Sequence, residues 1–156
     1  MTAPLTEQIL DLIETKLAGI TIGGGYQETV LAANIFRPPE APADVRSAGC
    51  PAVVVRHNGT NNRWHLRAAE ELLIEVQFIC VATTYALLAI LMADVKKLVY
   101  ANPYWNNGAA NLARRTWVAE ERTHETEVNQ EAVTGSLVIH VLARADRTNP
   151  FATKAV

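Results

Sequence analysis

The stretch from Glu70 to Tyr100 constrains the fold most, because a strand pattern runs directly into a helix pattern. Apolar residues alternate through Leu72–Val81 and include β-branched and aromatic side chains, which is typical of a strand. One face carries Ile74, Val76, Phe78 and Cys80, and the other carries Leu73, Glu75, Gln77, Ile79 and Val81. Apolar residues on both faces predict a central strand.

A long helix follows this strand. Thr83 or Thr84 offers a hydroxyl that can cap the first turn. Apolar residues then recur at helical spacing, at Tyr85, Leu88, Leu91, Met92, Val95, Leu98 and Val99. Asn102-Pro103 ends the helix, because the residue before proline is pushed out of the helical region. The strand and helix carry no catalytic motif, so they are interpreted as a scaffold.

Composition places the chain among globular proteins. The 156 residues are 49% hydrophobic and 19% charged, which fits one folded domain. A net charge of -2 and a pI near 6.1 give no general attraction to nucleic acid or anionic membranes. No apolar run reaches a membrane span of about 20 residues, and no export leader is recognised. The two cysteines, Cys50 and Cys80, favour a reducing compartment without disulfides.

The elements before the central strand are predicted from the same patterns. Pro4–Leu17 has the spacing of an amphipathic helix, and Tyr26–Arg37 alternates as a strand. Pro38–Pro51, with four prolines, predicts a surface loop. Ala52–His57 predicts a short strand, and Asn58-Gly59 a turn that opens a long hairpin with the central strand.

The elements after the helix complete the fold prediction. Asn102–Asn111 is interpreted as a loop, and Leu112–Thr123 and Ser136–Arg144 as strands without a helix between them. The sequence therefore predicts an α+β fold, with a largely antiparallel four- to five-stranded sheet, two helices packed on one face, long loops and a hairpin. Residues 1–144 are predicted to form a single domain and residues 145–156 a polar C-terminal tail.

Signatures of catalysis or metal binding are missing from the sequence. The four histidines lie on different predicted elements without metal-binding spacing, and neither cysteine has an activated context. Gly23-Gly24-Gly25 lacks the Lys-Ser/Thr pair of a phosphate loop. We therefore predict no enzyme, no cofactor and no metal. A small enzyme or ligand-binding α+β domain without a known motif stays open as an alternative.

Two loop tryptophans are candidate contact residues. Trp64 and Trp105 lie among asparagine, glycine and proline residues, and exposed tryptophan is frequent at the centre of interfaces. The alternative is that both fold back over the edge of the sheet. Arg114 and Arg115 beside Trp117 could form a small basic patch. Two arginines alone do not indicate recognition of nucleic acid.

The order of these elements resembles the tail terminator proteins of tailed bacteriophages and related minor tail or neck proteins. The resemblance covers the opening helix, the Pro51–Val55 strand after a proline-containing loop, the Glu71–Val81 strand, the helix with Asp94-Val95 near its middle, and two closing strands. Its most specific part is the polar ending Arg144–Phe151, with Asn149-Pro150 before the aromatic residue. The long Pro38–Pro51 loop and the acidic Glu120–Glu131 stretch depart from that family pattern.

The resemblance implies a virion protein in the phage tail or neck, assembled in the cytoplasm of the host bacterium. A homohexameric ring would cap the tail tube protein, stop its polymerisation and offer a docking face for the head–tail connector or stopper protein. A sheath protein would be a further partner in a contractile tail. Another neck or sheath-joining role is the alternative within the same setting, and no membrane is implied.

The resemblance also gives possible roles to single residues. Trp64, Trp105, Arg114, Arg115 and Phe151 become candidates for contacts between subunits. The acidic residues Glu120, Glu121, Glu125 and Glu127 could face the lumen of the ring. Carboxylates there would repel phosphates, so DNA would pass through without specific binding.

Overall fold

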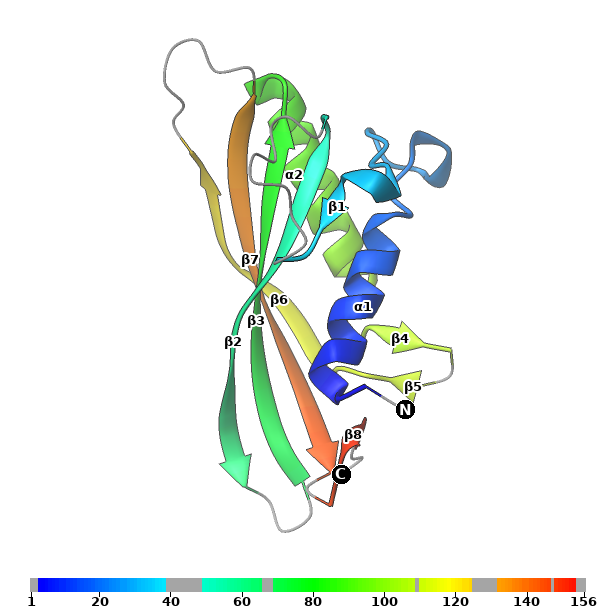
Figure 1. Ribbon diagram of the computed structural model, residues 1–156, viewed down its shortest axis with the longest axis vertical. Helices are drawn as coiled ribbons and strands as arrows, with labels where there is room; N and C mark the ends of the chain where they lie inside the picture. Colours follow the sequence, from blue (N-terminus) through cyan, green and yellow to red (C-terminus); the bar gives the residue numbers. More distant parts are fainter. Residues whose placement is uncertain are drawn as a thin grey trace.

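The computed structural model describes residues 3–38, 49–65, 69–108, 110–124, 132–146 and 148–153. In it a twisted sheet carries helices α1 (Leu5–Leu17) and α2 (Tyr85–Ala101) on one face (Figure 1). The strands are β1 (Ile35–Phe36), β2 (Ala52–His65), β3 (Ala69–Ala82), β6 (Arg115–Thr123), β7 (Val133–Asp146) and β8 (Asn149–Thr153), and β4 (Asn106–Asn107) and β5 (Ala110–Asn111) form a separate small hairpin.

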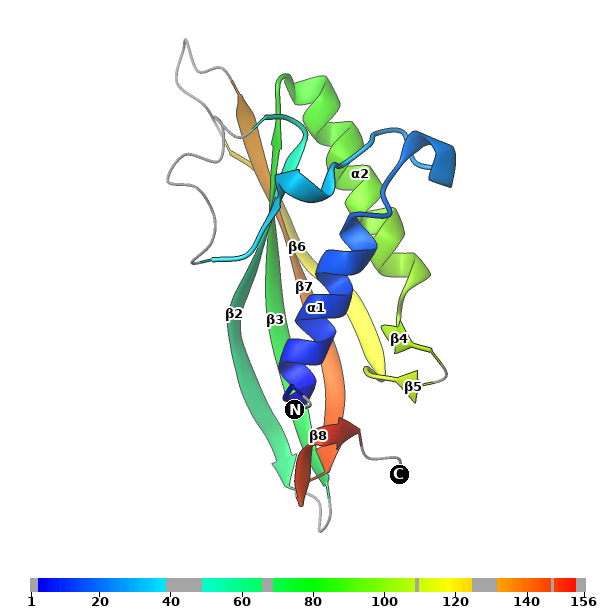
Figure 2. The same cartoon turned by 45° about the vertical axis from the view of Figure 1, so that its right-hand side comes forward.

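The sheet has six strands in the order β1-β2-β3-β7-β6, with β8 paired to β7. The β1–β2 pair is parallel, and the other pairs in this sheet are antiparallel. The predicted α+β fold is confirmed, including its largely antiparallel sheet and its two helices on one face. We call the helix-covered face the helix side and the opposite face the open side (Figure 2).

The central strand β3 forms as the sequence predicts. It pairs with β2 on one edge and with β7 on the other. Its predicted core residues are fully buried on the helix side, namely Ile74, Val76, Phe78 and Cys80. Strand β7 adds Leu137, Ile139, Val141 and Ala143 to the same core. Each fully buried large apolar side chain contributes about 1.5–3 kcal/mol, so this layer is the main source of stability.

Helix α2 also agrees with the prediction. Thr84 Oγ1 accepts a hydrogen bond from the Leu87 amide at 3.2 Å, which caps the first turn. The helix ends at Ala101, immediately before Asn102-Pro103. It packs close to the sheet at Gly135, where an added Cβ would lie 2.6 Å from Met92 Sδ. A side chain at this position would therefore require the Met92 side chain or the Arg122 backbone of β6 to shift.

The predicted strand Tyr26–Arg37 is wrong over most of its length, because only Ile35–Phe36 is a strand. The buried carboxylate of Asp94 accepts hydrogen bonds from the amides of Gln27 at 3.0 Å and Glu28 at 2.8 Å. These bonds tie the segment to α2 instead of to a neighbouring strand. A short 3-10 helix, Ala32–Asn34, then leads into β1.

The predicted turn at Asn58-Gly59 is also wrong, because β2 continues through it to His65. Gly59 has a φ of 139°, and the register with β3 shifts between His57 and Gly59. The glycine therefore forms a bulge within a long strand, which its backbone freedom permits. The predicted long hairpin is confirmed, because β2 and β3 pair antiparallel along their length.

Strand β8 (Asn149–Thr153), near the C-terminus, is part of the sheet. Strand β7 runs past the predicted boundary at residue 144 to Asp146, and β8 then pairs back on it. Gln8 Nε2 of α1 donates hydrogen bonds to the carbonyls of Phe151 at 2.8 Å and Ala3 at 2.6 Å. The described part of the predicted polar tail, up to Thr153, is thus held between the sheet and the start of α1.

Candidate functional site

Trp105 is the clearest correction to the sequence-based candidates. The structure buries its side chain completely within the main hydrophobic core, so it is not an exposed anchor. The backbone of this loop is held by hydrogen bonds from the Trp105 amide to Asn102 O and from the Leu112 amide to Trp105 O, both at 3.3 Å. Polar neighbours in the sequence suggested exposure, but the loop turns inward to cover the end of the core. For Trp105, the alternative given in the sequence analysis, that the side chain folds back over the edge of the sheet, is therefore the better interpretation.

Trp64 and Phe151 remain candidate contact residues. Trp64 lies in β2, where its backbone pairs with Glu71, and its side chain lies outside the described residues. Phe151 lies in β8 with 42% of its surface exposed. Trp64 is near the C-terminal end of β2, and this end of β2 lies with β8 at the lower end of the sheet in Figure 1. The role of Trp64 and Phe151 in contacts between subunits stays a prediction.

The predicted basic patch is part of a row of polar and aromatic side chains on the open side. Arg115 lies over the Trp117 ring, with 5.3 Å between its guanidinium carbon and the ring centroid. The Trp117 ring meets the His140 ring edge-on, with centroids 5.4 Å apart. His140 Nε2 is 3.2 Å from Glu75 Oε1. The row crosses β6, β7 and β3, which the sequence analysis did not bring together.

Arg114 contributes to this region through its backbone. It precedes β6, and its amide donates a hydrogen bond to Leu142 O at 2.7 Å. Its side chain is exposed. One sequence signal could have revealed this row. His140 lies between Val138 and Leu142 on the second face of β7, and a histidine there indicates a face that is not fully buried.

The acidic candidates divide between described and undescribed residues. Glu120 and Glu121 are exposed on β6, and their alternation directs them to opposite faces of the sheet. Glu120 forms an ion pair with Arg122, and Glu121 forms one with Lys96 of α2 at 2.8 Å. Glu125 and Glu127 lie outside the described residues. Each described carboxylate therefore has a cation beside it.

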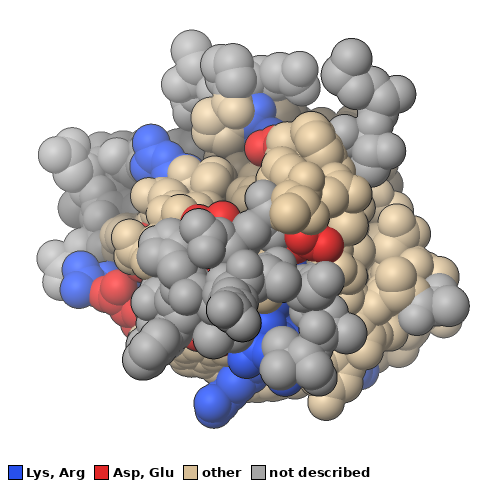
Figure 3. All heavy atoms as spheres, turned by 90° about the horizontal axis from the view of Figure 1, so that it is seen from below, with Lys and Arg blue, Asp and Glu red and all other residues tan. Residues whose placement is uncertain are grey.

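Charges of both signs are also mixed on the lower end of the molecule. Figure 3 shows lysine or arginine and aspartate or glutamate interspersed there, without a large patch of one sign among the described residues.

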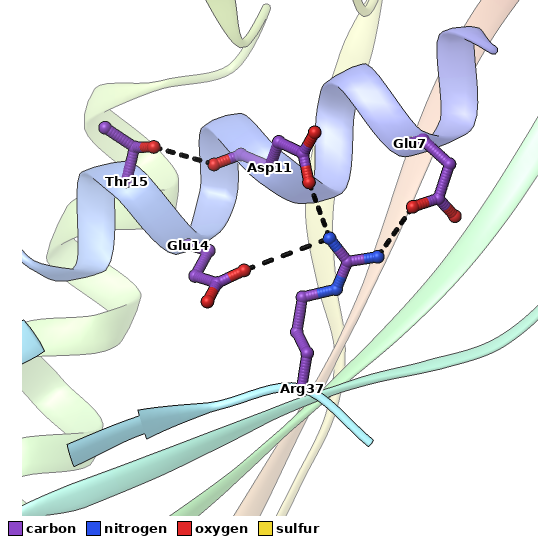
Figure 4. A network of polar contacts seen from close by, with 5 residues as sticks. All are labelled: Glu7, Asp11, Glu14, Thr15 and Arg37. Atoms are coloured by element: carbon purple, nitrogen blue, oxygen red, sulfur yellow. Dashed lines mark hydrogen bonds and ion pairs between the residues drawn. The ribbon is translucent and has the colours of Figure 1, made fainter. Parts of the chain in front are cut away.

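A cluster of acidic side chains on α1 holds Arg37, which follows β1 (Figure 4). The guanidinium lies 2.8 Å from Glu7, 2.6 Å from Asp11 and 3.8 Å from Glu14. Partial burial alone would lower the pKa of Arg37, but hydrogen bonds and attraction from Glu7 and Asp11 raise it. The cluster fastens β1 to α1 and is explained by this structural role.

Neither cysteine has the character of a nucleophile. Burial raises the pKa of the Cys80 thiol to about 12 and also raises the pKa of Cys50. Cys50 borders a pocket of about 190 Å³, which Glu28, Pro51, Ala82, Thr83 and Leu87 also line. The larger pocket, of about 470 Å³, is an open groove beside α1 lined by Asp11, Glu14, Thr15, Ala18, Ala32 and Ile35. Neither brings an activated nucleophile to a base.

Metal-binding clusters and membrane-spanning helices are both absent from the described residues. Within the described ranges, no group of three or more histidine, cysteine, aspartate or glutamate side chains could hold a metal ion. No helix in that part of the structure has the length and apolar character needed to cross a membrane.

Comparison with known proteins gives a match at the level of structure. No family model matches the chain, and no curated protein matches it significantly. A solved structure titled "Virion of native gene transfer agent (GTA) particle" contains a chain of similar fold, with a TM-score of 0.54 and 9% sequence identity. The alignment covers 85% of this chain and 92% of that chain. At this identity the match establishes a shared α+β fold.

Proposed function

We propose that this chain is a structural protein of a tailed phage-like particle. It forms a ring that terminates the tail tube and provides a surface for joining the head. The observation that carries the proposal is the fold match to a chain of a gene transfer agent virion, which spans 85% of this chain and 92% of the other. Because the alignment covers nearly the whole of both chains, the similarity concerns the complete domain.

The surfaces of the chain suit assembly better than catalysis. The end of the long β2–β3 hairpin, the β4–β5 hairpin and β8 lie around the lower end of the sheet (Figure 1), and Phe151 of β8 is exposed there. Subunits in a ring contact each other through two different surfaces, which projecting hairpins and sheet faces can supply. The pocket beside Cys50 and the groove beside α1 lack the activated groups that a reaction would need.

The proposed partners follow from this role. Copies of the chain form a ring, which we propose to be a hexamer. One side of the ring contacts the tail tube protein and the other contacts the head–tail connector. A contractile tail would add the sheath protein. Assembly takes place in the host cytoplasm, and the finished ring belongs to the virion.

The acidic residues that we propose to face the lumen of the ring are partly neutralised. Glu120 and Glu121 each lie beside a cation, so their repulsion of passing DNA is weaker than that of free carboxylates. Their placement in the lumen remains part of the proposal, together with that of Glu125 and Glu127. Cross-linking that maps Glu120 and Glu121 to the outer rim of the ring would contradict it.

The experiment is deletion of the gene in the phage or prophage that encodes the chain, followed by electron microscopy of the particles. Loss of a terminator produces tubes of uncontrolled length that lack heads, and supply of the chain in trans restores normal tails. Tails of normal length that fail to join heads would indicate a different neck role. Normal, infectious particles would contradict a structural role altogether.

A further inference from the structure

The outer surface of α2 is unusually apolar for an exposed helix. From Thr83 to Ala93 the sequence contains no charged residue. Five exposed side chains in this stretch form what we call the helix patch, which consists of Ala86, Leu87, Ala89, Ile90 and Ala93. Leu87 is 38% exposed and Ile90 37% exposed. A helix that is apolar on all sides is normally buried, so the helix patch calls for a partner.

A second apolar surface lies on the open side of the sheet. We call it the sheet patch, and it consists of Leu73, Trp117, Val138 and Leu142, all partly exposed. The register places Leu73 of β3 opposite Leu142 of β7, with Trp117 of β6 opposite His140. Among the described elements, no helix or strand lies over this face (Figure 2).

The two patches face in opposite directions, because α2 covers one face of the sheet and the sheet patch lies on the other. Two different surfaces on opposite sides of one chain are what a head-to-tail contact between copies requires. The sheet already accepts a helix on its helix side, where α2 packs on β3, β7 and β6. A second helix on the open side would complete a layered arrangement with both faces covered.

Charges beside the two patches are complementary. Lys97 lies one turn beyond Ala93, and its ammonium contacts the Gly25 carbonyl at 2.5 Å and the Tyr26 ring at 5.0 Å. No described carboxylate forms an ion pair with it. Glu75 lies beside the sheet patch, with its side chain 44% exposed and His140 as its ion-pair partner.

The spacing of the two charges from the apolar groups also matches. Four residues along a helix, from Ala93 to Lys97, span about 6 Å. Two residues along a strand, from Leu73 to Glu75, span about 7 Å. A helix patch seated on a sheet patch can therefore bring Lys97 of one copy near Glu75 of the next.

We propose that the helix patch of one copy docks on the sheet patch of the next copy, with Lys97 opposite Glu75. The inference rests on the proposed ring and specifies which surfaces build it. A second copy is favoured over another protein because this one chain carries both complementary surfaces. Face-to-face pairing of two sheet patches, or binding of a different protein, are outcomes that the test separates.

The test uses two variants that each block one patch. Ala89→Glu places a carboxylate in the helix patch, and Leu142→Glu places one in the sheet patch opposite Leu73, so the two blocked patches also repel each other. Ala110→Glu on the exposed β5 strand is the matched control. Native mass spectrometry and analytical ultracentrifugation give the oligomeric state at matched concentrations.

We expect the wild type and Ala110→Glu to form the same closed oligomer, and each blocked variant alone to stay monomeric. A mixture of the two blocked variants should form a one-to-one dimer and stop there, because each still has the patch that the other lacks. The Lys97→Glu variant should weaken assembly about tenfold, and Glu75→Lys in the same chain should restore it.

Several results would overturn the docking inference. Absence of the mixed dimer contradicts the docking inference. Normal oligomerisation of both blocked variants contradicts it as well. If a blocked variant fails to fold by circular dichroism, Ala93→Cys and Leu142→Cys chains in a Cys50→Ser background are mixed instead, because Leu142 pairs with Leu73, and absence of a disulfide-linked dimer contradicts the inference. Tail length after gene deletion decides the proposed function separately.

Discussion

The two faces of strand β7 show how one sequence pattern serves two purposes. On the helix side Leu137, Ile139 and Val141 are fully buried under α1 and α2. On the open side Val138, His140 and Leu142 alternate with them and stay partly exposed. Both faces are largely apolar, yet among the described elements only the helices on one face provide cover. The difference teaches that hydrophobic alternation predicts a strand but does not tell which face has an internal partner.

The open side differs from the helix side in chemistry as well as burial. It combines apolar residues with the Arg115–Trp117–His140–Glu75 row, in which each group contacts the next. Tryptophan and arginine are enriched where protein surfaces meet. The helix side, by contrast, contains mainly aliphatic residues. One face therefore stabilises the domain, while the other has the composition of a contact surface.

The largest expected effect tests this comparison on a single strand. Leu137→Ala should destabilise the isolated chain by about 2–5 kcal/mol, because it leaves a cavity in the packed core. Leu142→Ala removes the same atoms from the open side and should cost about 1 kcal/mol or less. Urea denaturation of both variants measures the difference. Equal losses of stability would show that the two faces are equally packed.

The next effect concerns the close approach of α2 to the sheet. Gly135→Ala should cost about 1–3 kcal/mol, because its Cβ would meet Met92 Sδ at 2.6 Å and the Arg122 carbonyl oxygen at 3.0 Å. Gly23→Ala is the control, since an added Cβ there meets no atom within 4 Å. Thermal unfolding of the two variants checks the prediction, which fails if both behave alike.

Substitution of the buried carboxylate Asp94 on the helix side should cost as much stability as Gly135→Ala, or less. Asp94→Asn should cost about 1–3 kcal/mol, because the neutral amide cannot accept equally from the Gln27 and Glu28 amides. Hydrogen exchange should accelerate at those two amides more than elsewhere. Exchange that is unchanged at residues 27 and 28 would show that the carboxylate does not hold this segment.

The smallest expected effect lies at the rim of the helix side. Arg37→Gln removes three ion pairs with α1, yet it should cost less than about 1 kcal/mol, because the acidic partners are half-exposed and screened by water. The stability difference from the wild type should shrink as salt is added. Chemical denaturation at low and high ionic strength measures this. A loss as large as that of Leu137→Ala would contradict the assignment of stability to the apolar core.

Local patterns predicted the elements that have strong periodicity. Strand β3 and helix α2 agree with the sequence, because their side chains repeat at the periods of a strand and a helix. The Thr84 cap and the stop before Pro103 follow from local chemistry for the same reason. These features depend on neighbours only a few residues apart.

Predictions that depended on propensity alone were less successful. Asn58-Gly59 favours a turn, but pairing of β2 with β3 on both sides of it outweighs that preference and leaves a bulge. Tyr26–Arg37 alternates, but the Asp94 carboxylate captures its backbone amides. Of the two tryptophans in polar surroundings, Trp105 is buried. Each error arose where a distant residue supplied the deciding contact.

The sequence by itself determined the class of fold, the central strand, the two helices and the antiparallel hairpin, because these follow from the spacing of apolar side chains along the chain. Only the tertiary structure decided which face of the sheet is covered, where Trp105 lies, and that Trp117, His140 and Glu75 form a row. The physical reason is that burial and cross-strand contact depend on residues that are far apart in the chain. No local period records which distant surface will meet them.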